Sequence, residues 1–281
     1  MEGCLIVYSA LCVLTMSFSL AFDCNQILSD TEIKFLNWEK LEECIIEIGR
    51  NAVDKKSSER IWQLVKNAND GIENISPLVY KNMGNLVTGI PLEDLRNITI
   101  NVVEIVKAFG SVQKGFTDEQ MNLIAQKVRS EWPNKIPQTY SEYDLKSMGQ
   151  IVCYLNRSDI AAIHAVALRF AVEWIGNLEN CPADRMQAFA KLAVQHDAFG
   201  PPASWSTLDV SIMGNIIKGL TPSEIDSISK DKLQFNKHFR VHKNRLNSTA
   251  TMSENVWRRR NKADNSSNKG EPNEESNTMS N

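Results

Sequence analysis

Apolar residues recur every three or four positions through most of the chain, and no segment of convincing length alternates between apolar and polar residues. The first spacing is typical of amphipathic helices and the second of half-buried strands. Thr221-Pro222-Ser223-Glu224 is a helix start signal, with a threonine N-cap, proline at the first helical position and a glutamate placed to close a capping box. The pattern therefore predicts an all-α fold over about residues 24–230.

The chain repeats itself at an interval of 65 residues, as shown by Met83-Gly84, Met148-Gly149 and Met213-Gly214. Three segments align around these pairs without a gap, at 75–98, 140–163 and 205–228, and residues 116–128 align with 181–193 at the same interval. A repeat with one apolar side must stack on its neighbours to bury that side. We therefore expect a superhelical stack like that of armadillo or HEAT proteins. Its units, of about three helices each, would lie at roughly 28–74, 75–139, 140–204 and 205–229.

Every Met-Gly pair places a glycine inside the predicted first helix of its unit. Glycine there costs about 1 kcal/mol relative to alanine, so its recurrence at one position predicts a close approach between helices. Ser206 is expected to cap the start of this helix. Gly89 and Gly219 are expected to end it with a positive φ, and Tyr154 replaces them in the second copy.

Residues 3–21 are almost uninterrupted apolar and small residues, and Ser19 and Ala21 fit positions −3 and −1 of a signal-peptidase site. The apolar core, Leu5 to Leu20, is short compared with the roughly 20 residues of a membrane span. We interpret residues 1–21 as a secretory signal peptide, with an uncleaved signal anchor as the alternative. Export would place the rest of the chain in an oxidising compartment.

Four cysteines follow the leader: Cys24, Cys44, Cys153 and Cys181. Of the three pairings they allow, we favour Cys24–Cys44 and Cys153–Cys181, because each closes a loop of about 20 to 30 residues and contributes roughly 3 kcal/mol in the chain-entropy model. Free buried thiols are the alternative. No CxxC pair is present, so the sequence gives no support to redox or zinc chemistry.

Five N-x-S/T sequons follow the leader, and in an exported chain they mark surface positions that can carry glycan. They begin at Asn74, Asn97, Asn156, Asn247 and Asn265. Asn74 and Asn156 lie at predicted turns, whereas Asn97 falls inside a helical pattern.

The charge changes near residue 230. Residues 22–229 hold 20 basic and 27 acidic residues, a net charge of −7, whereas residues 230–262 hold ten Lys and Arg against two acidic residues. We expect residues 231–281 to form a disordered tail, first basic and then polar. Its residues Lys237, Arg240, Lys243 and Arg245 are candidates for binding a polyanion, and a solvated tail without a binding role is the alternative. The net charge of −3 gives no case for nucleic-acid binding.

The sequence contains no HExxH, GxSxG, P-loop or GxGxxG motif. Its four histidines are His164, His196, His238 and His242. His164 lies in a helical pattern and His196 beside Asp197 near a helix end, where a cationic ring is favourable. We expect no enzyme, no metal and no cofactor.

The repeat columns resemble the repeats of the mesothelin, stereocilin and otoancorin family. The shared pattern is an aromatic residue with serine, aspartate, Met/Leu-Gly, an apolar run, Gly-Leu, Ser/Thr-Pro-x-Glu and isoleucine, and residues 205–228 match it best. Over roughly residues 28–230, this resemblance implies a secreted or cell-surface glycoprotein with armadillo-like repeats that attaches cells to matrices, mucins or gels without being an enzyme. This chain is short and lacks the C-terminal apolar tail of a GPI-anchored member, so the resemblance implies neither an anchor nor particular contact residues.

We therefore expect an adhesion protein that binds extracellular matrix, mucin or a cell-surface glycoprotein. The alternatives are a secreted hydrolase whose acids converge only in the fold, and a lumenal carrier of an apolar ligand. A shallow extended face would indicate the adhesion protein, and a deep polar pocket with shifted carboxyl pKa values would indicate the hydrolase. An enclosed apolar cavity would indicate the carrier.

Overall fold

The computed structural model describes residue 24 and residues 36–238, and the regular structure of this part is all helical, without a strand. The leader at residues 1–21 and the tail beyond residue 238 lie outside the described residues.

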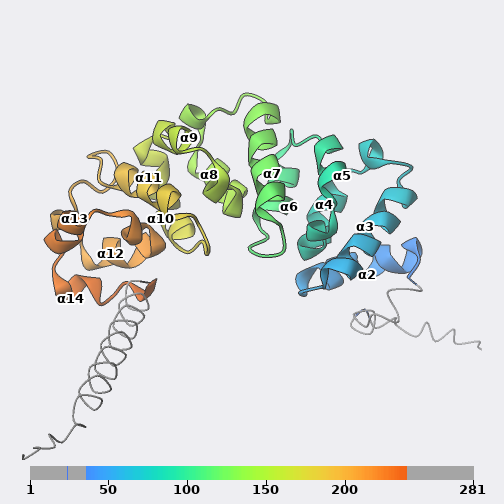
Figure 1. Cartoon of the computed structure of the whole chain (residues 1–281), viewed down its shortest axis with the longest axis horizontal. Coiled ribbons are helices and arrows are strands. Elements are labelled where there is room, and N and C mark those ends of the chain that lie inside the picture. Colours follow the sequence, from blue (N-terminus) through green and yellow to red (C-terminus); the bar gives the residue numbers. More distant parts are fainter. Residues whose placement is uncertain (1–23, 25–35, 239–281) are drawn as a thin grey trace, which may run out of the picture.

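The helices form an arch with an inner and an outer layer (Figure 1). In the inner layer each helix packs against the next one. Its members are α2 (Trp38–Arg50), α4 (Pro77–Met83), α6 (Val103–Gly110), α8 (Glu142–Met148), α10 (Ala165–Gly176), α12 (Thr207–Met213) and α14 (Lys230–Leu233). The outer layer holds α3 (Lys55–Ala68), α5 (Leu92–Asn97), α7 (Asp118–Glu131), α9 (Arg157–Ala162), α11 (Ala183–Ala193) and α13 (Pro222–Ser227).

Three 3₁₀ helices lie between the layers and contact helices of both. They are η3 (Gly84–Gly89), η5 (Gly149–Tyr154) and η7 (Gly214–Gly219). Shorter 3₁₀ turns, η2 (Ile72–Asn74), η4 (Pro137–Thr139) and η6 (Pro202–Ser204), occupy connections. A complete unit thus holds four α-helices and a central 3₁₀ helix. The sequence predicted about three helices for each unit. The arrangement is consistent with the stacked repeats expected from the sequence.

The Met-Gly pairs lie where the inner helices end and the 3₁₀ helices begin. Gly84, Gly149 and Gly214 have φ values of 51°, 47° and 52°, a conformation that side chains rarely adopt. The prediction that these glycines sit inside a regular helix is therefore wrong, because the backbone turns at each of them.

The predicted close approach is confirmed, and it is a contact between two glycines. Gly84 lies against Gly49 at the end of α2, and a Cβ built on it would be 2.5 Å from the Gly49 carbonyl oxygen. Gly149 meets Gly110 of α6 and Gly214 meets Gly176 of α10 in the same way. Any side chain at these six positions would overlap backbone, so the helices cross with their main chains in contact.

Gly89 and Gly219 are required because a side chain would not fit there, and not because the backbone needs a positive φ. Neither has a positive φ, so that prediction is wrong. A Cβ on Gly89 would overlap the backbone of α3 at Ser58, and one on Gly219 would overlap that of α11 at Met186. Tyr154, the corresponding residue in the second unit, donates its hydroxyl hydrogen to Asp118 Oδ1 on α7 at 2.9 Å.

Side chains cap the helices as the sequence predicts. Ser206 and Thr221 close capping boxes with Asp209 and Glu224, and Thr117 does so with Gln120. Each box satisfies backbone N–H groups that the first helical turn leaves without a partner.

The folded part extends beyond the boundary predicted at residue 230. α14 packs against α12, and Asn236 is fully buried with its amide donating to Val210 O and Gly214 O at 2.8 and 3.1 Å. The polar composition of this segment concealed its burial, because only Leu233 and the hydrogen-bonded amide of Asn236 are buried in it.

The structure contains the disulfides Cys24–Cys44 and Cys153–Cys181, which span 20 and 28 residues. The second joins η5 to the connection after α10, beside the crossing of Gly176 with Gly214. Both cysteines belong to the unit predicted at 140–204, so this disulfide links two elements of one unit covalently.

Replacing Gly149 by alanine should cost about 3 kcal/mol or more of unfolding free energy, because strain at positive φ adds to overlap with the Gly110 backbone. Gly200 is the matched control: it has a φ of +69°, but a Cβ there would meet nothing nearer than 4.0 Å. Gly200→Ala should cost only about 1–2 kcal/mol. Urea unfolding of both variants measures the difference, and equal losses would show that backbone contact does not govern this site.

Removing the Cys153–Cys181 disulfide with a double alanine variant should lower stability by about 3.5 kcal/mol, from the 28-residue separation in the chain-entropy model. The same change at Cys24 and Cys44 should cost about the same, since its separation is 20 residues. Denaturant midpoints of the two variants and the wild type check this. A double variant as stable as the wild type would contradict it.

Candidate binding surface

The solvent-facing side of the inner layer carries large apolar residues at equivalent repeat positions. Leu78, Tyr143 and Leu208 each occupy the second residue of α4, α8 and α12, at intervals of 65 residues. They are 58%, 73% and 68% exposed. These side chains contribute little to the core. Other residues of the same helices form the core and are buried.

A second set of exposed apolar residues runs along α10. Val166, Phe170 and Trp174 are spaced by four residues, which places them on one side of the helix, and about half or more of each is exposed. The opposite side of α10, including Leu168 and Ile175, is buried in the core. α10 therefore has apolar residues on both its packed and its solvent-facing side.

At the position of Phe170 the equivalent helices carry acids, and at the position of Trp174 one of them does. Counting back six residues from the crossing glycines gives Glu43 on α2, Glu104 on α6 and Phe170 on α10. Counting back two gives Glu47, Ala108 and Trp174. Since both equivalent helices tolerate charge at its position, Phe170 is not required for packing, and half of Trp174 is exposed to solvent. An exposed apolar patch that folding does not need marks an interaction site.

We name Tyr143, Val166, Phe170 and Trp174 the aromatic face. Two open hollows border it and share Phe170 between them. One, of about 500 Å³, is lined by Tyr140, Ser141, Glu142, Tyr143, His164, Val166, Ala167 and Phe170. The other, of about 440 Å³, is lined by Gln113, Lys146, Phe170, Glu173, Trp174, Asn177 and Leu178.

The second hollow combines apolar rings with a few polar groups. The Lys146 ammonium lies 3.3 Å from Glu142, so its charge is largely balanced within α8. Glu173 is exposed on the same side of α10 as Trp174. Apolar walls with sparse polar groups are the usual lining of a recognition site, in which the polar groups set orientation.

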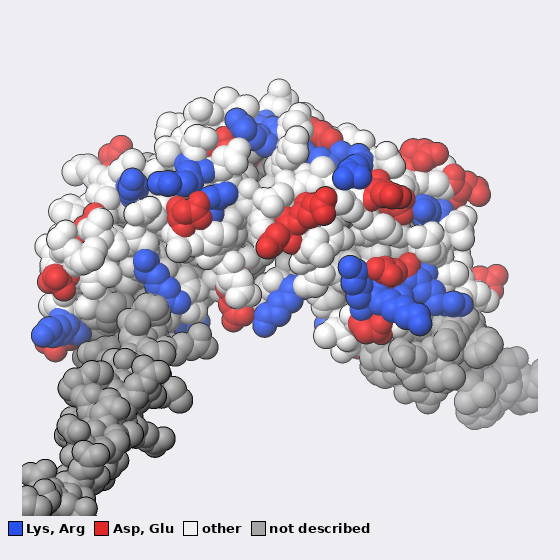
Figure 2. All heavy atoms as spheres, viewed as in Figure 1, with Lys and Arg blue, Asp and Glu red and all other residues white. Residues whose placement is uncertain are grey.

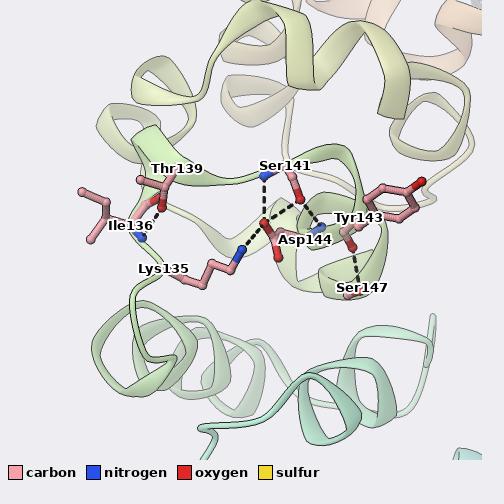
Figure 3. A network of polar contacts seen from close by, with 7 residues as sticks. All are labelled: Lys135, Ile136, Thr139, Ser141, Tyr143, Asp144 and Ser147. Carbon is pink, nitrogen blue, oxygen red and sulfur yellow. Dashed lines mark hydrogen bonds and ion pairs between the residues drawn. The ribbon is translucent and has the colours of Figure 1, made fainter.

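A polar network holds the start of α8 behind Tyr143 (Figure 3). Asp144 Oδ2 accepts hydrogen bonds from Ser141 N, Ser141 Oγ and Lys135 Nζ at 2.8, 2.7 and 2.7 Å. Burial alone would raise the pKa of Asp144, but the bonds from Lys135 and Ser141 outweigh it and lower that pKa. In Figure 3 the ring of Tyr143 points away from this network. The network thus fixes the helix start while leaving the ring available.

Buried amides hold the connections beside the hollows. Asn215 donates to Leu178 O at 2.9 Å, and Asn85 donates to Asn51 O at 3.2 Å in the first unit. Gln150, at the same repeat position, is longer by one methylene and donates to Glu179 O at 2.9 Å. The bonds of Asn215 and Gln150 hold the backbone after α10, which borders the aromatic face, and the bond of the half-buried Asn85 holds the backbone after α2.

Charge on the arch is mixed. Figure 2 shows Lys and Arg side chains lying beside Asp and Glu. Several form ion pairs between elements, such as Lys66 with Asp94 at 3.0 Å and Arg129 with Asp159 at 3.2 Å. Among the described residues, the aromatic face is therefore the more distinctive surface feature.

The residues predicted from sequence are scattered over the surface. Asn74, Asn97 and Asn156 are exposed, at the ends of η2 and α5 and at the start of α9. Lys237 is exposed in the last described turn. The other predicted positions, Asn247, Asn265, Arg240, Lys243 and Arg245, lie outside the described residues.

Within residue 24 and residues 36–238, no helix is long and apolar enough to cross a membrane. The same residues hold no cluster of three or more potential metal ligands. His164 lines the hollow beside Tyr143, and His196 is exposed 3.5 Å from Asp197. Asp54 and Asp144 have lowered pKa values, through hydrogen bonds that cap helices.

Sequence reasoning missed the aromatic face. The Met-Gly pairs were aligned, but their partners Gly49, Gly110 and Gly176 were not. An alignment on these three glycines places Phe170 opposite Glu43 and Glu104, and Trp174 opposite Glu47 and Ala108. A glutamate at the equivalent position is the signal that separates an exposed ring from a core ring.

Comparison with known proteins gives one distant likeness. Otoancorin of Homo sapiens is 24% identical over 154 residues, which are 55% of this chain and 13% of otoancorin. The chain thus spans about one eighth of that relative's length. No protein-family model matches the chain, and no solved structure matches it.

Replacing Asp144 by asparagine should lower stability by about 1–2 kcal/mol at pH 7, since Lys135 loses its partner. Because the pKa of Asp144 is lowered in the folded state, its contribution is complete above the unfolded pKa near 3.8. It is lost as the pH falls through the lower folded value, so the difference from wild type should shrink below about pH 4. Urea unfolding from pH 7 to pH 3 measures it.

Asp209→Asn is the control for this prediction, because Asp209 closes the same capping box in the next unit and has no lysine corresponding to Lys135. Its loss should be smaller. A larger loss at Asp209, or one independent of pH at Asp144, would refute the assigned role of the ion pair.

Proposed function

We propose that this chain is an exported adhesion protein that binds extracellular matrix, mucin or a cell-surface glycoprotein through the aromatic face. The observation that carries the proposal is the replacement of Glu43 and Glu104 by Phe170 at one position of the inner layer, with Trp174 one turn away. Exposed Trp, Tyr and Phe are the residues that contribute most to protein interfaces.

The form of the site supports binding to a large partner rather than catalysis. The hollows beside Phe170 are open to solvent, and their floor is the rigid inner layer. Rigid aromatic anchors lose little conformational entropy on binding, so they give affinity without a deep pocket. No observation on the described residues favours a hydrolase or a carrier of an apolar ligand.

Two further observations support an extracellular setting. The disulfides Cys24–Cys44 and Cys153–Cys181 are typical of proteins that fold in an oxidising compartment. The repeat pattern resembles that of the mesothelin, stereocilin and otoancorin family, and this resemblance implies adhesion. The likeness to otoancorin agrees with it. Glycan at Asn74, Asn97 or Asn156 would lie on exposed positions.

The double variant Phe170→Ser/Trp174→Ser should reduce binding of the full chain to immobilised matrix, mucin or cells by at least about tenfold, since hot-spot aromatic residues contribute more than about 1 kcal/mol each. Its unfolding free energy should change little, because both rings are half or more exposed. Surface plasmon resonance and urea unfolding measure the two effects.

Leu78→Ser is the matched control, because Leu78 is 58% exposed on α4 and lies outside the aromatic face. It should leave binding unchanged. The proposal fails if the wild type binds none of the three kinds of surface, or if the double variant binds as well as the wild type.

A further inference from the structure

The last described residues turn back across the inner layer. α14 packs against α12, and the Asn236 amide is fixed to Val210 O and Gly214 O of the α12–η7 segment. Gly214 itself lies against Gly176 at the end of α10. The chain after α14 is therefore held against α12, next to the segment that contacts the C-terminal end of α10.

The ring of His238, the last described residue, is influenced by charges on η7 and on the connection that follows α10. Burial lowers its pKa, the charges of Lys237 and Lys218 lower it further, and Glu179 of that connection raises it. Nε2 of His238 is buried without a hydrogen-bond partner among the described residues. Because Asn236 is bonded to Gly214 and Gly214 lies against Gly176, the chain leaves the described structure near the end of α10 that carries Trp174.

The distance to the aromatic face is short compared with the chain that follows. Trp174 and Glu179 are five residues apart in sequence, so their Cα atoms lie within roughly 18 Å. The next eight residues, 239–246, span up to about 27 Å when extended. The segment is therefore long enough to reach Trp174 and Phe170.

The chemistry of this segment matches that of the second hollow. Residues 239–246 read Phe-Arg-Val-His-Lys-Asn-Arg-Leu, with apolar side chains interspersed among basic ones. The hollow offers two exposed rings and the Glu173 carboxylate, while its one ammonium, Lys146, is paired with Glu142. Apolar contact with the rings and attraction to Glu173 would both favour such a segment.

We propose that residues 239–246 of this chain occupy the aromatic face. The apolar residues of this segment cover Trp174 and Phe170, and its basic residues lie near Glu173. This intramolecular contact does not depend on the proposed adhesive function. If adhesion uses the same face, an external partner must displace the segment. The apparent affinity of the partner is then reduced in proportion to the fraction of molecules in which the segment covers the face.

The test is hydroxyl-radical footprinting of the full chain, which reads the solvent exposure of individual side chains by mass spectrometry. The tail variant is Phe239→Ser/Val241→Ser/Leu246→Ser, and Met252→Ser/Val256→Ser is the control with apolar residues removed outside the segment. If the face is covered about two thirds of the time, oxidation of Phe170 and Trp174 should rise about threefold in the tail variant. It should stay at the wild-type rate in the control, and Leu78 serves as an internal reference.

Equal oxidation of Phe170 and Trp174 in the wild type and the tail variant would overturn the proposal. So would protection that disappears on dilution, because it would assign the face to a second copy of the chain. The footprinting uses no external partner, so its result stands apart from the adhesion assay. Loss of adhesion alone would leave this contact intact, and an uncovered wild-type face would leave the adhesive proposal intact.

Discussion

The contact between two glycine backbones is the constraint on which the rest of the structure depends. At Gly49–Gly84, Gly110–Gly149 and Gly176–Gly214 no side chain separates the main chains. The positive φ of Gly84, Gly149 and Gly214 ends α4, α8 and α12, and each of these helices is followed by a 3₁₀ helix that lies between the two layers. The same glycine-to-glycine contact, present three times, thereby sets how the helices cross and where the 3₁₀ helices lie.

This way of assembling the stack leaves the other side of the inner layer without a packing role. α2, α6 and α10 make the same crossing, yet they present glutamates in two cases and aromatic rings in the third. The packed residues and the exposed rings therefore lie on opposite sides of α10. The capping network of Ser141 and Asp144 and the amides of Gln150 and Asn215 keep the surroundings of the rings fixed.

Much of the fold could be predicted because its signals are local. Capping boxes at Thr117 and Thr221, the 65-residue interval and the two short-range disulfides each depend on residues close together in sequence. The conformation of Gly84 and the requirement for Gly89 depend on a partner helix that periodicity does not identify. Likewise, helical spacing shows that Phe170 and Trp174 share a side of α10, but only packing shows that this side faces solvent.

The most direct test of the central claim is an experimental structure of the full chain, read at the three crossings. We expect Gly84, Gly149 and Gly214 to have positive φ and to lie in backbone contact with Gly49, Gly110 and Gly176. Side chains layered between these helices, or regular α-helix continuing through the Met-Gly pairs, would contradict the account.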